Sequence, residues 1–424
     1  MNVESQVVYK ENAGPRSGPK EVRMRKVVVV AAGLVLLAVS AFGQNVIKLG
    51  ANWPLADVSG LECSRAAQLA VDEINKAGGV LGKQLQLIVV DDEGKGDKGV
   101  AAIEKLATVD KVDVLLGGIA SGVAAAQVPT MKKYQIVTVA TGAAASSVVE
   151  KALGPSPDSD WYFHLHPWDY NQGQSYLDGW DAIQKKYPDV KINRIFLAYE
   201  EGAFGKSSFV ASKALFGSRY TFDGASFKSA LQGGSDYSAV LEAAKDFKPD
   251  LFIWAGYAQD ALPLLEQSKA MKFSPPIYLG APPAWPVDMG KSPLAEDIML
   301  YGMWAPSINA ISPVSRKFYN AYMAAYGAPP TSYFGALSYS AVYIIADAIK
   351  RAGGTEKAGL IAALEATRYV SPLGETITFT PSAVIKHQGI KNQKILQWQN
   401  GTQEVIWPFE VQSKPLVYPL PAWK

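Results

Sequence analysis

The amino-acid sequence predicts an α/β protein made of two similar lobes, each a parallel sheet covered by helices. Short apolar stretches typical of strands alternate with helical patterns from residue 46 to residue 140, and the same alternation restarts after residue 165. Strands that alternate with helices favour parallel sheets, because the chain needs a long crossover to return to a parallel strand. The length of 424 residues and the 48% hydrophobic composition suit a globular chain of two or three domains.

The first alternating block begins with the apolar segment VIKLGANW at residues 46–53, which predicts a strand. A helix is expected next, because apolar residues recur with helical spacing over residues 66–74, and Ser59 is its expected N-cap. Gly78 and Gly79 end this helix by supplying left-handed backbone. The pattern then predicts strands at 85–90, 112–116 and 136–140, with helices at 100–106 and 123–133.

The second block contains three more strand patterns, RIFLAY, DLFIWAG and PIYLG, at residues 194–199, 250–256 and 276–280. Helices are expected between these strands, beginning at Lys206 and Asp260. The tail segment KILQWQNGTQEVIW predicts a β-hairpin, since Asn-Gly suits the tight turn between antiparallel strands. Before that tail, helical patterns return at 314–325, 334–352 and 357–367.

The first 43 residues predict an N-terminal extension followed by a secretory signal. Three basic residues at 23–26 precede an unbroken apolar run at 27–39, and small residues near Gly43 suit a cleavage site. The alternative, a membrane anchor, needs a longer apolar span of about 20 residues. We therefore expect a periplasmic or secreted protein after cleavage near Gly43. A true start at Met24 is a further hypothesis, because the residues before it are polar.

Charge and cysteine content exclude several classes of function. The formal net charge of the whole chain is +2, and removal of the basic signal brings the chain close to neutrality. A near-neutral chain lacks the basic surface of nucleic-acid-binding proteins, so we expect no nucleic acid partner. Cys63 is the only cysteine, so no intrachain disulfide can form. No segment after the signal is apolar enough to predict a membrane span.

A glycine pattern at Gly94, Gly96 and Gly99 matches the G-x-G-x-x-G fingerprint of dinucleotide-binding proteins. That fingerprint needs its first glycine at the end of the first strand, whereas these glycines follow the second predicted strand. The acids of the DDE segment at 91–93 also stand where a pyrophosphate would lie. We therefore expect no nucleotide and no other cofactor.

The segment INKAGGVLGKQLQLIVVDDEGK joins a helix, a double-glycine stop and a strand that ends in acids. Six other segments belong to the same pattern: LGANWPLADVSG, DVLLGGIASG, IVTVATGAAASS, YEEGAFGKS, FIWAGYAQDA and VSPLGETITFTP. Together they resemble the type I periplasmic binding proteins of ABC importers, in particular the leucine-binding protein-like branch for branched-chain and hydrophobic amino acids. The resemblance covers essentially all of residues 46–410.

The resemblance implies two Rossmann-like lobes joined by a three-segment hinge, with the ligand in the cleft between the lobes. It implies crossovers near 164–168, 300–307 and 371–376, with lobe 1 at 46–164 plus about 305–372 and lobe 2 at 165–304 plus about 373–424. It also implies a solute-binding protein rather than an enzyme. Such a protein closes on a small-molecule ligand, hands it to the permease and ATPase subunits of an ABC transporter, and meets the membrane only through that transporter.

Ligands of open α/β sheets bind beyond the carboxyl ends of the strands, so ligand contacts are expected in the residues that follow each strand. Ser121 and the amides near Gly122 and Gly142 suit a carboxylate. Aromatic residues at other strand ends suit an apolar body, although each of them taken singly is as typical of core packing. The full set of expected contacts is Trp53, Ser121, Gly122, Thr141, Gly142, Ala143, Ala144, Phe204, Tyr257, Pro282 and Trp285.

The ligand class is open between two kinds of carboxylate. In the family that the chain resembles, a hydroxyl residue usually stands at Ala144 and an acid near Pro282, and both help to hold an α-ammonium. Their absence favours a hydrophobic or aromatic carboxylate over leucine, isoleucine or valine, since an ammonium is costly to bury without an acceptor. Asp260 and Asp288 are alternative acceptors, and nothing in the sequence places them in the cleft.

Two alternatives to a transport protein are a ligand-sensing module of the same fold and an exported enzyme. His164, His166 and Asp169 together could suggest a metal site, but they lie at a predicted crossover, where a buried and hydrogen-bonded histidine is the commoner arrangement. Ser121 lies in GIASG, which is not the G-x-S-x-G elbow of a nucleophilic serine, and no base is visible for it. We expect no metal and no catalytic residue.

Overall fold

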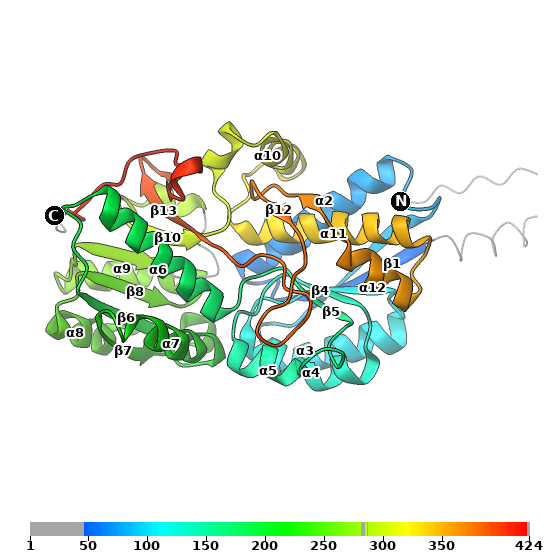
Figure 1. Ribbon diagram of the computed structural model, residues 1–424, viewed down its shortest axis with the longest axis horizontal. Helices are drawn as coiled ribbons and strands as arrows, with labels where there is room; N and C mark the ends of the chain where they lie inside the picture. Colours follow the sequence, from blue (N-terminus) through cyan, green and yellow to red (C-terminus); the bar gives the residue numbers. More distant parts are fainter. Residues whose placement is uncertain (1–45, 281–284, 286, 422–424) are drawn as a thin grey trace, which may run out of the picture. The chain divides into compact units, whose positions relative to one another are not determined.

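The computed structural model describes residues 46–280, 285 and 287–421 (Figure 1). The predicted extension and signal at 1–43 lie outside this part, as does Pro282. Within it the framework consists of two main sheets and a small two-stranded one. No helix of the described part is both long and apolar enough to span a membrane.

The first sheet has five strands in the order β2-β1-β3-β4-β5. β1, β3, β4 and β5 pair in parallel, which confirms the arrangement predicted for the first block. β3 and β4 are buried along their whole length, as expected for parallel strands with both faces covered. The strands are β1 (Val46–Trp53), β2 (Gln84–Asp91), β3 (Val114–Gly117), β4 (Thr138–Ala140) and β5 (Tyr162–His164).

The helices of the first sheet come from two distant parts of the chain. α2 packs along α11, so a helix from late in the chain covers one formed near its start (Figure 1). The early helices are α2 (Val58–Lys76), α3 (Gly96–Lys105) and α4 (Ser121–Tyr134). The late helices are α10 (Pro313–Tyr326), α11 (Tyr333–Ala352) and α12 (Lys357–Glu365).

The predicted start of α2 is wrong by two residues. Asp57, not Ser59, is the N-cap, and its Oδ1 accepts a hydrogen bond from the Ser59 N–H at 2.8 Å. Asp and Ser are both good caps, because a short side chain reaches the free N–H groups of the first turn. Asp57 takes this place since its backbone is extended, whereas Ser59 is already helical.

The second sheet has seven strands in the order β14-β13-β10-β9-β8-β6-β7. The strands from β6 to β10 pair in parallel, whereas β13 is antiparallel to both β10 and β14. The strands are β6 (Arg194–Glu200), β7 (Thr221–Phe227), β8 (Leu251–Ala255), β9 (Ile277–Gly280), β10 (Met299–Gly302), β13 (Lys394–Gln399) and β14 (Thr402–Trp407).

Helices α6 (Asp169–Lys186), α7 (Ala203–Phe216), α8 (Ser238–Phe247) and α9 (Ala261–Ala270) accompany the second sheet. The predicted tail hairpin is confirmed, because β13 and β14 pair antiparallel across Asn400 and Gly401. Both turn residues have positive φ, 53° and 75°, as the tight turn requires. The short connecting elements are η1 (Leu106–Asp110), η2 (Ser146–Glu150), α5 (Lys151–Leu153), η3 (Ala230–Gln232), η4 (Ala258–Asp260), η5 (Val287–Lys291), η6 (Pro306–Ala310), β11 (Tyr369–Val370), β12 (Thr376–Ile377) and η7 (Phe409–Val411).

The chain passes between the two main sheets after β5, after β10 and between β12 and β13. In the last of these segments the Gly389 N–H donates to the His164 carbonyl at 2.7 Å, and the Ile390 N–H donates to the Leu165 carbonyl at 3.0 Å. The chain therefore still lies beside the end of β5 at residue 390. Residues 371–376, where the third crossover was expected, turn between β11 and β12 of one hairpin.

Candidate functional site

The turns that follow β3 and β4 are joined at the carboxyl end of the first sheet. The Thr141 N–H donates to the Gly117 carbonyl at 2.8 Å. A Cβ placed on Gly142 would lie 2.5 Å from the Gly118 carbonyl oxygen, so the close approach of these two turns needs glycine there. The structure thus brings two of the predicted binding turns together.

Ser121 connects the same two turns through its side chain. It is the first residue of α4, is 1% exposed, and its Oγ accepts a hydrogen bond from the Ala145 N–H at 3.2 Å. Because that bond uses the oxygen as acceptor, the hydroxyl hydrogen remains a donor. The first N–H groups of a helix also lack partners within the helix, and Gly122, the next residue, is exposed. Ser121 and the start of α4 therefore present donors that suit an anion.

Replacing Ser121 by alanine is expected to weaken carboxylate binding by about 1.5–3 kcal/mol, because a hydrogen bond to a charged group is lost. The variant should also lose some folding stability, since the buried Ala145 N–H loses its acceptor. Titration calorimetry and chemical denaturation measure the two effects. Ser340→Ala is the matched control, because the buried Ser340 hydroxyl donates to the Ala336 carbonyl within α11. A loss of stability at Ser121 with unchanged affinity would make this hydroxyl purely structural.

A small cavity lies where residues from both blocks and from α11 meet. Four predicted contacts line it: Ala143, Ala144, Phe204 and Tyr257. The cavity has room for little more than a water molecule, so its walls must move apart to admit a solute. The lining residues that the sequence did not single out as contacts are Ile119, His166, Gln172, Tyr333 and Phe334.

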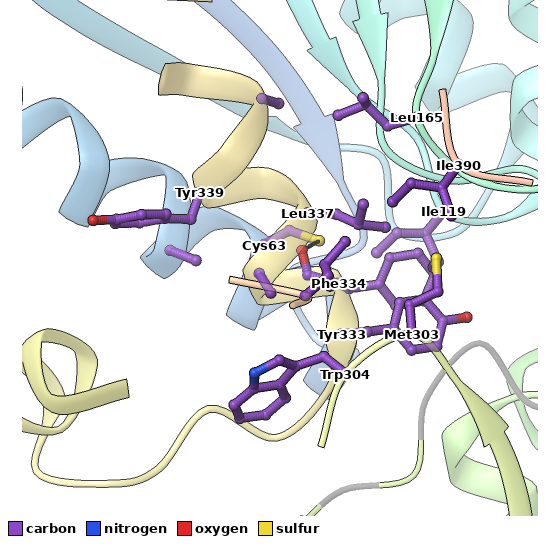
Figure 2. Close-up of a cluster of buried hydrophobic side chains, with 14 of the residues drawn as sticks. Cys63, Ile119, Leu165, Met303, Trp304, Tyr333, Phe334, Leu337, Tyr339 and Ile390 are labelled. Atoms are coloured by element: carbon purple, nitrogen blue, oxygen red, sulfur yellow. Dashed lines mark hydrogen bonds between the residues drawn. The ribbon is translucent and has the colours of Figure 1, made fainter. Parts of the chain in front are cut away.

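Aromatic rings make up much of the cavity wall. Phe204 and Tyr257 follow β6 and β8, and their ring centroids are 6.0 Å apart. Tyr333 and Phe334 are the first residues of α11, with ring centroids 4.7 Å apart, and Figure 2 shows both near Ile119. Burial raises the pKa of Tyr257 well above its ordinary value, so its hydroxyl stays protonated. These walls suit an apolar or aromatic body.

Trp53 and Trp285 are absent from the lining of this cavity. Trp53 ends β1 and is fully buried, and its indole Nε1 has no hydrogen-bond partner among the described residues. Trp285 is 1% exposed and packs against Trp254 with ring centroids 5.4 Å apart. Their roles as ligand walls stay predictions, as does the role of Pro282.

His164 and His166 are buried and hydrogen-bonded, which confirms the structural interpretation of this pair. His166 Nδ1 lies 2.9 Å from the Pro167 carbonyl oxygen, and Nε2 lies 3.2 Å from the Tyr333 hydroxyl. Burial lowers the pKa of His166 to about 3 and the pKa of His164 to about 4, so both are neutral at physiological pH. No three His, Cys, Asp or Glu side chains of the described part form a group that could hold a metal ion.

Asp260, one of the two acids considered as a replacement ammonium acceptor, is fully buried and saturated with hydrogen bonds. Both of its oxygens are engaged, so it organises the loop that carries Tyr257. The side chain of Asp288, the other acid, lies outside the described part. Asp260 accepts from Ser229 Oγ at 2.7 Å, the Ala230 N–H at 2.6 Å, Tyr237 Oη at 2.7 Å and the Tyr257 N–H at 2.8 Å.

Asp57 is a buried acid that the sequence analysis missed, because Ser59 was expected to cap α2. It lies in the loop after β1 and is 6% exposed. Its Oδ1 caps the helix, whereas its Oδ2 is buried and has no hydrogen-bond partner among the described residues. Burial raises the pKa of Asp57, and the negative charge of Asp260 adds to the rise. A strand end on the predicted binding edge therefore carries a carboxylate oxygen without a partner.

A small polar network connects the turn after β4 with the helices of the second sheet. Ser146 Oγ donates to Asp169 Oδ1 at 2.6 Å, and Ser147 Oγ lies 2.7 Å from Ser207 Oγ. The Ser207 hydroxyl also donates to Asp169, the first residue of α6. These bonds join the two blocks beside the cavity, because Ala144 and Gln172, close to the network in the chain, both line it.

Two relatives with known names match nearly the whole chain. Leu/Ile/Val-binding protein homolog 7 of Brucella melitensis is 22% identical over 91% of this chain and 97% of its own length. Leu/Ile/Val-binding protein homolog 8 of Brucella suis is 22% identical over 91% of this chain and 97% of its own length.

Solved structures share the two-lobed fold, and a family model identifies the chain. The branched-chain amino acid transporter substrate-binding protein LivJ from Streptococcus pneumoniae, in complex with isoleucine, has a TM-score of 0.70 and 22% identity, over 88% of this chain and 100% of that one. An ABC transporter solute-binding protein from R. palustris, in complex with benzoate, has a TM-score of 0.71 and 20% identity. The match covers 89% of this chain and 97% of that one. The model of the periplasmic binding proteins matches residues 48–403. Since that match spans most of the sequence, this chain belongs to the periplasmic binding protein family, in the type I branch that its segments resemble.

Proposed function

We propose that this protein is an exported solute-binding protein that captures a small carboxylate-bearing ligand and delivers it to an ABC importer. The observation that carries the proposal is the place of Ser121. Its hydroxyl and the free N–H groups of α4 follow the turn that lines the cavity through Ile119. Ser121 is not itself a lining residue, but it follows Ile119 closely in the chain, so donors for an anion lie near the aromatic cavity, the combination that a hydrophobic carboxylate needs.

The proposed ligand is a hydrophobic or aromatic carboxylate, or a branched-chain amino acid. Both chemistries occur among proteins of this fold, since LivJ is in complex with isoleucine and the R. palustris protein with benzoate. The apolar walls formed by Phe204, Tyr257 and Phe334 accommodate either body. Neither neighbour decides between them, because each is at most 22% identical to this chain.

We assign the expected contacts to two roles within this proposal. The ligand carboxylate is bound by the Ser121 hydroxyl, by the backbone N–H groups near Gly122 and by the turn formed by residues 141–144. The wall role falls to the aromatic residues that follow strands, and the unpartnered Trp53 indole N–H gives that residue a donor as well. The wall residues are Trp53, Phe204, Tyr257, Pro282 and Trp285.

The capture step is a closure of two lobes, each built around one main sheet. We place the hinge in the three segments that pass between the sheets, with lobe boundaries near residues 164 and 305 and a third boundary after residue 390. The pairing of Gly389 and Ile390 with the end of β5 supports the last position in place of 372. The protein then hands the chemically unchanged ligand to the permease and ATPase subunits of the transporter. It meets the membrane only through that transporter.

Thermal unfolding with single carboxylates tests the proposal. Benzoate, 3-phenylpropanoate, leucine and isoleucine are the probes, and one of them is expected to stabilise the protein by about 2.7 kcal/mol at 100 times its Kd. Small-angle scattering should show a more compact particle with the same probe. The control is the methyl ester of that acid, which has the same body without the negative charge.

Three outcomes would contradict the proposal. If the methyl ester stabilised the protein as much as the acid does, the proposed anion site would be wrong. Chemical conversion of the bound probe, detected by mass spectrometry, would favour the exported enzyme. Binding without any uptake when the protein is reconstituted with its transporter subunits would favour the ligand-sensing module.

A further inference from the structure

The loop after β1 holds one carboxylate oxygen that nothing in the described part uses. Asp57 Oδ1 caps α2 through the Ser59 N–H, but Oδ2 is buried and unpartnered. Buried carboxylates are normally paired or fully hydrogen-bonded, since an unsatisfied charge in a protein interior is costly. The orphan oxygen is therefore open to a donor that the described residues do not supply.

The surroundings of Asp57 indicate where that donor would be. The charge of Asp57 acts on Tyr257, which lines the cavity, and on Asp260 in the same loop of the second sheet. Asp57 is not itself one of the lining residues, but it follows β1 at the strand-end edge of the first sheet, and its charge reaches Tyr257 in the cavity wall. Asp260 cannot supply a donor, because its oxygens already accept four hydrogen bonds. Among the described residues that line the cavity there is no lysine and no arginine.

We propose that Asp57 is a specificity-determining residue, whose Oδ2 accepts a hydrogen bond from a donor group on the bound solute. The inference rests on the proposed function and deepens it, because it adds a second polar requirement to the ligand. The solute must carry an ammonium or hydroxyl donor besides its carboxylate. Asp57 then supplies the acceptor that Ala144 and the APPAW segment lack.

The proposal reverses the preference for a carboxylate without an ammonium. A ligand that carries only a negative charge would enter a cavity already within reach of the charges of Asp57 and Asp260, and like charges repel strongly where water is excluded. A ligand with a donor next to its carboxylate satisfies Ser121 and Asp57 together. We therefore expect the amine-bearing member of a matched ligand pair to bind more tightly.

Asp57→Asn is the sharpest test, because asparagine is an equally good N-cap. The substitution keeps the capping oxygen and turns the orphan acceptor into a donor. Asp236→Asn is the matched control, since Asp236 Oδ1 makes the same bond to the N–H two residues later, that of Ser238, at an exposed position. Calorimetry compares phenylalanine with 3-phenylpropanoate, and leucine with 4-methylpentanoate.

We expect the unmodified protein to bind one amino acid at least 10-fold more tightly than its des-amino analogue. The Asp57→Asn variant should show an affinity ratio, amino acid over analogue, that is at least 10-fold smaller. It should also bind the analogue more tightly than the unmodified protein does, whereas Asp236→Asn should leave the ratio unchanged. An unchanged ratio in Asp57→Asn would overturn the proposal and reduce Asp57 to a helix cap. Failure of both members of every pair to bind would instead count against the proposed function.

A measurement without ligand makes the test independent of the choice of amino acids and analogues. If Oδ2 lacks a partner in the ligand-free protein, Asp57→Asn removes an unpaired buried charge, and Tm at pH 7.5 should rise relative to both the unmodified protein and Asp236→Asn. A fall in Tm would show that Oδ2 has a structural partner, and the proposal would be wrong whichever ligand binds.

Discussion

Replacing Glu62 by alanine is expected to lower the free energy of unfolding by about 3–5 kcal/mol, because a buried hydrogen-bond network is lost. Glu62 lies in α2 and is 2% exposed. Its carboxylate accepts hydrogen bonds from the Ser332 N–H at 3.0 Å and the Gly335 N–H at 3.2 Å, and also from Thr331, all at the start of α11. Alanine leaves these donors without an acceptor and opens a void. Chemical denaturation measures the loss.

The same substitution should weaken ligand binding. The residues that Glu62 holds are adjacent to Tyr333 and Phe334, which line the cavity. Glu73→Ala is the matched control, because Glu73 Oε2 also ties α2 to α11, through the Tyr339 and Tyr343 hydroxyls at 2.6 Å each, away from the cavity. Loss of stability in both variants, with loss of affinity only at position 62, is the expected pattern. Equal losses of affinity would mean that the whole helix pair, not its end, controls the cavity.

Glutamine at position 62 separates the charge from the shape of this side chain. Burial raises the pKa of Glu62 from 4.5 to about 7. For an acid with a raised pKa, the stabilising contribution is complete below pH 4.5 and is lost as pH rises to about 7. Between those values Glu62→Gln should gain on the order of 3 kcal/mol relative to the unmodified protein. A stability difference that does not vary with pH would contradict a buried carboxylate.

Acidification is expected to destabilise the protein through His164 and His166. Their pKa values are lowered from 6.5 to about 4 and about 3, mainly by burial. A histidine with a lowered pKa stabilises the fold fully above pH 6.5, and this contribution is lost as pH falls toward the lower value. Each histidine should cost on the order of 3 kcal/mol by pH 4.

Denaturation at a series of pH values between 7 and 4 measures this loss. His166→Gln is the informative variant, because glutamine keeps a polar group near the Tyr333 hydroxyl without a titrating ring. It should be less stable at pH 7 and lose less stability on acidification. An acid transition as steep as that of the unmodified protein would assign the effect to other groups. Glu62 acts in the opposite direction over an overlapping range, from pH 4.5 to about 7, so it should offset part of the loss that the two histidines cause.

The alternation of strand and helix patterns was enough to predict the parallel strands at the centre of both sheets, because burial on both faces makes β3 and β8 nearly all apolar. It failed for β7 and β10. β7 is a half-exposed edge strand, TFDGASF, with polar residues and a glycine, and β10, MLYG, is a short strand held between β9 and β13. Strands of this kind are held by their neighbours, and that information is not local in sequence.

The candidate site was predictable only where it follows strands. Phe204 and Tyr257 reach the cavity from strand ends, as expected. Tyr333 and Phe334 could not be found by that rule, because they begin a helix that joins the first sheet from much later in the chain. His166 also lines the cavity, and its spacing from His164 was noticed but interpreted as structural alone. For Asp57 the missing information was which residue caps α2, a choice set by backbone conformation.

The serine and aspartate network beside the cavity has a kinetic consequence. Ser146, Ser147 and Ser207 join the turn after β4 to α6 and α7 through Asp169, and none of the four lines the cavity. In the proposed closure mechanism, these bonds would have to break before the walls separate, whichever solute lies inside. We therefore expect them to slow the escape of every ligand alike, without adding to the selectivity among ligands. The lifetime of the loaded protein would then be set in part by groups that never touch the solute.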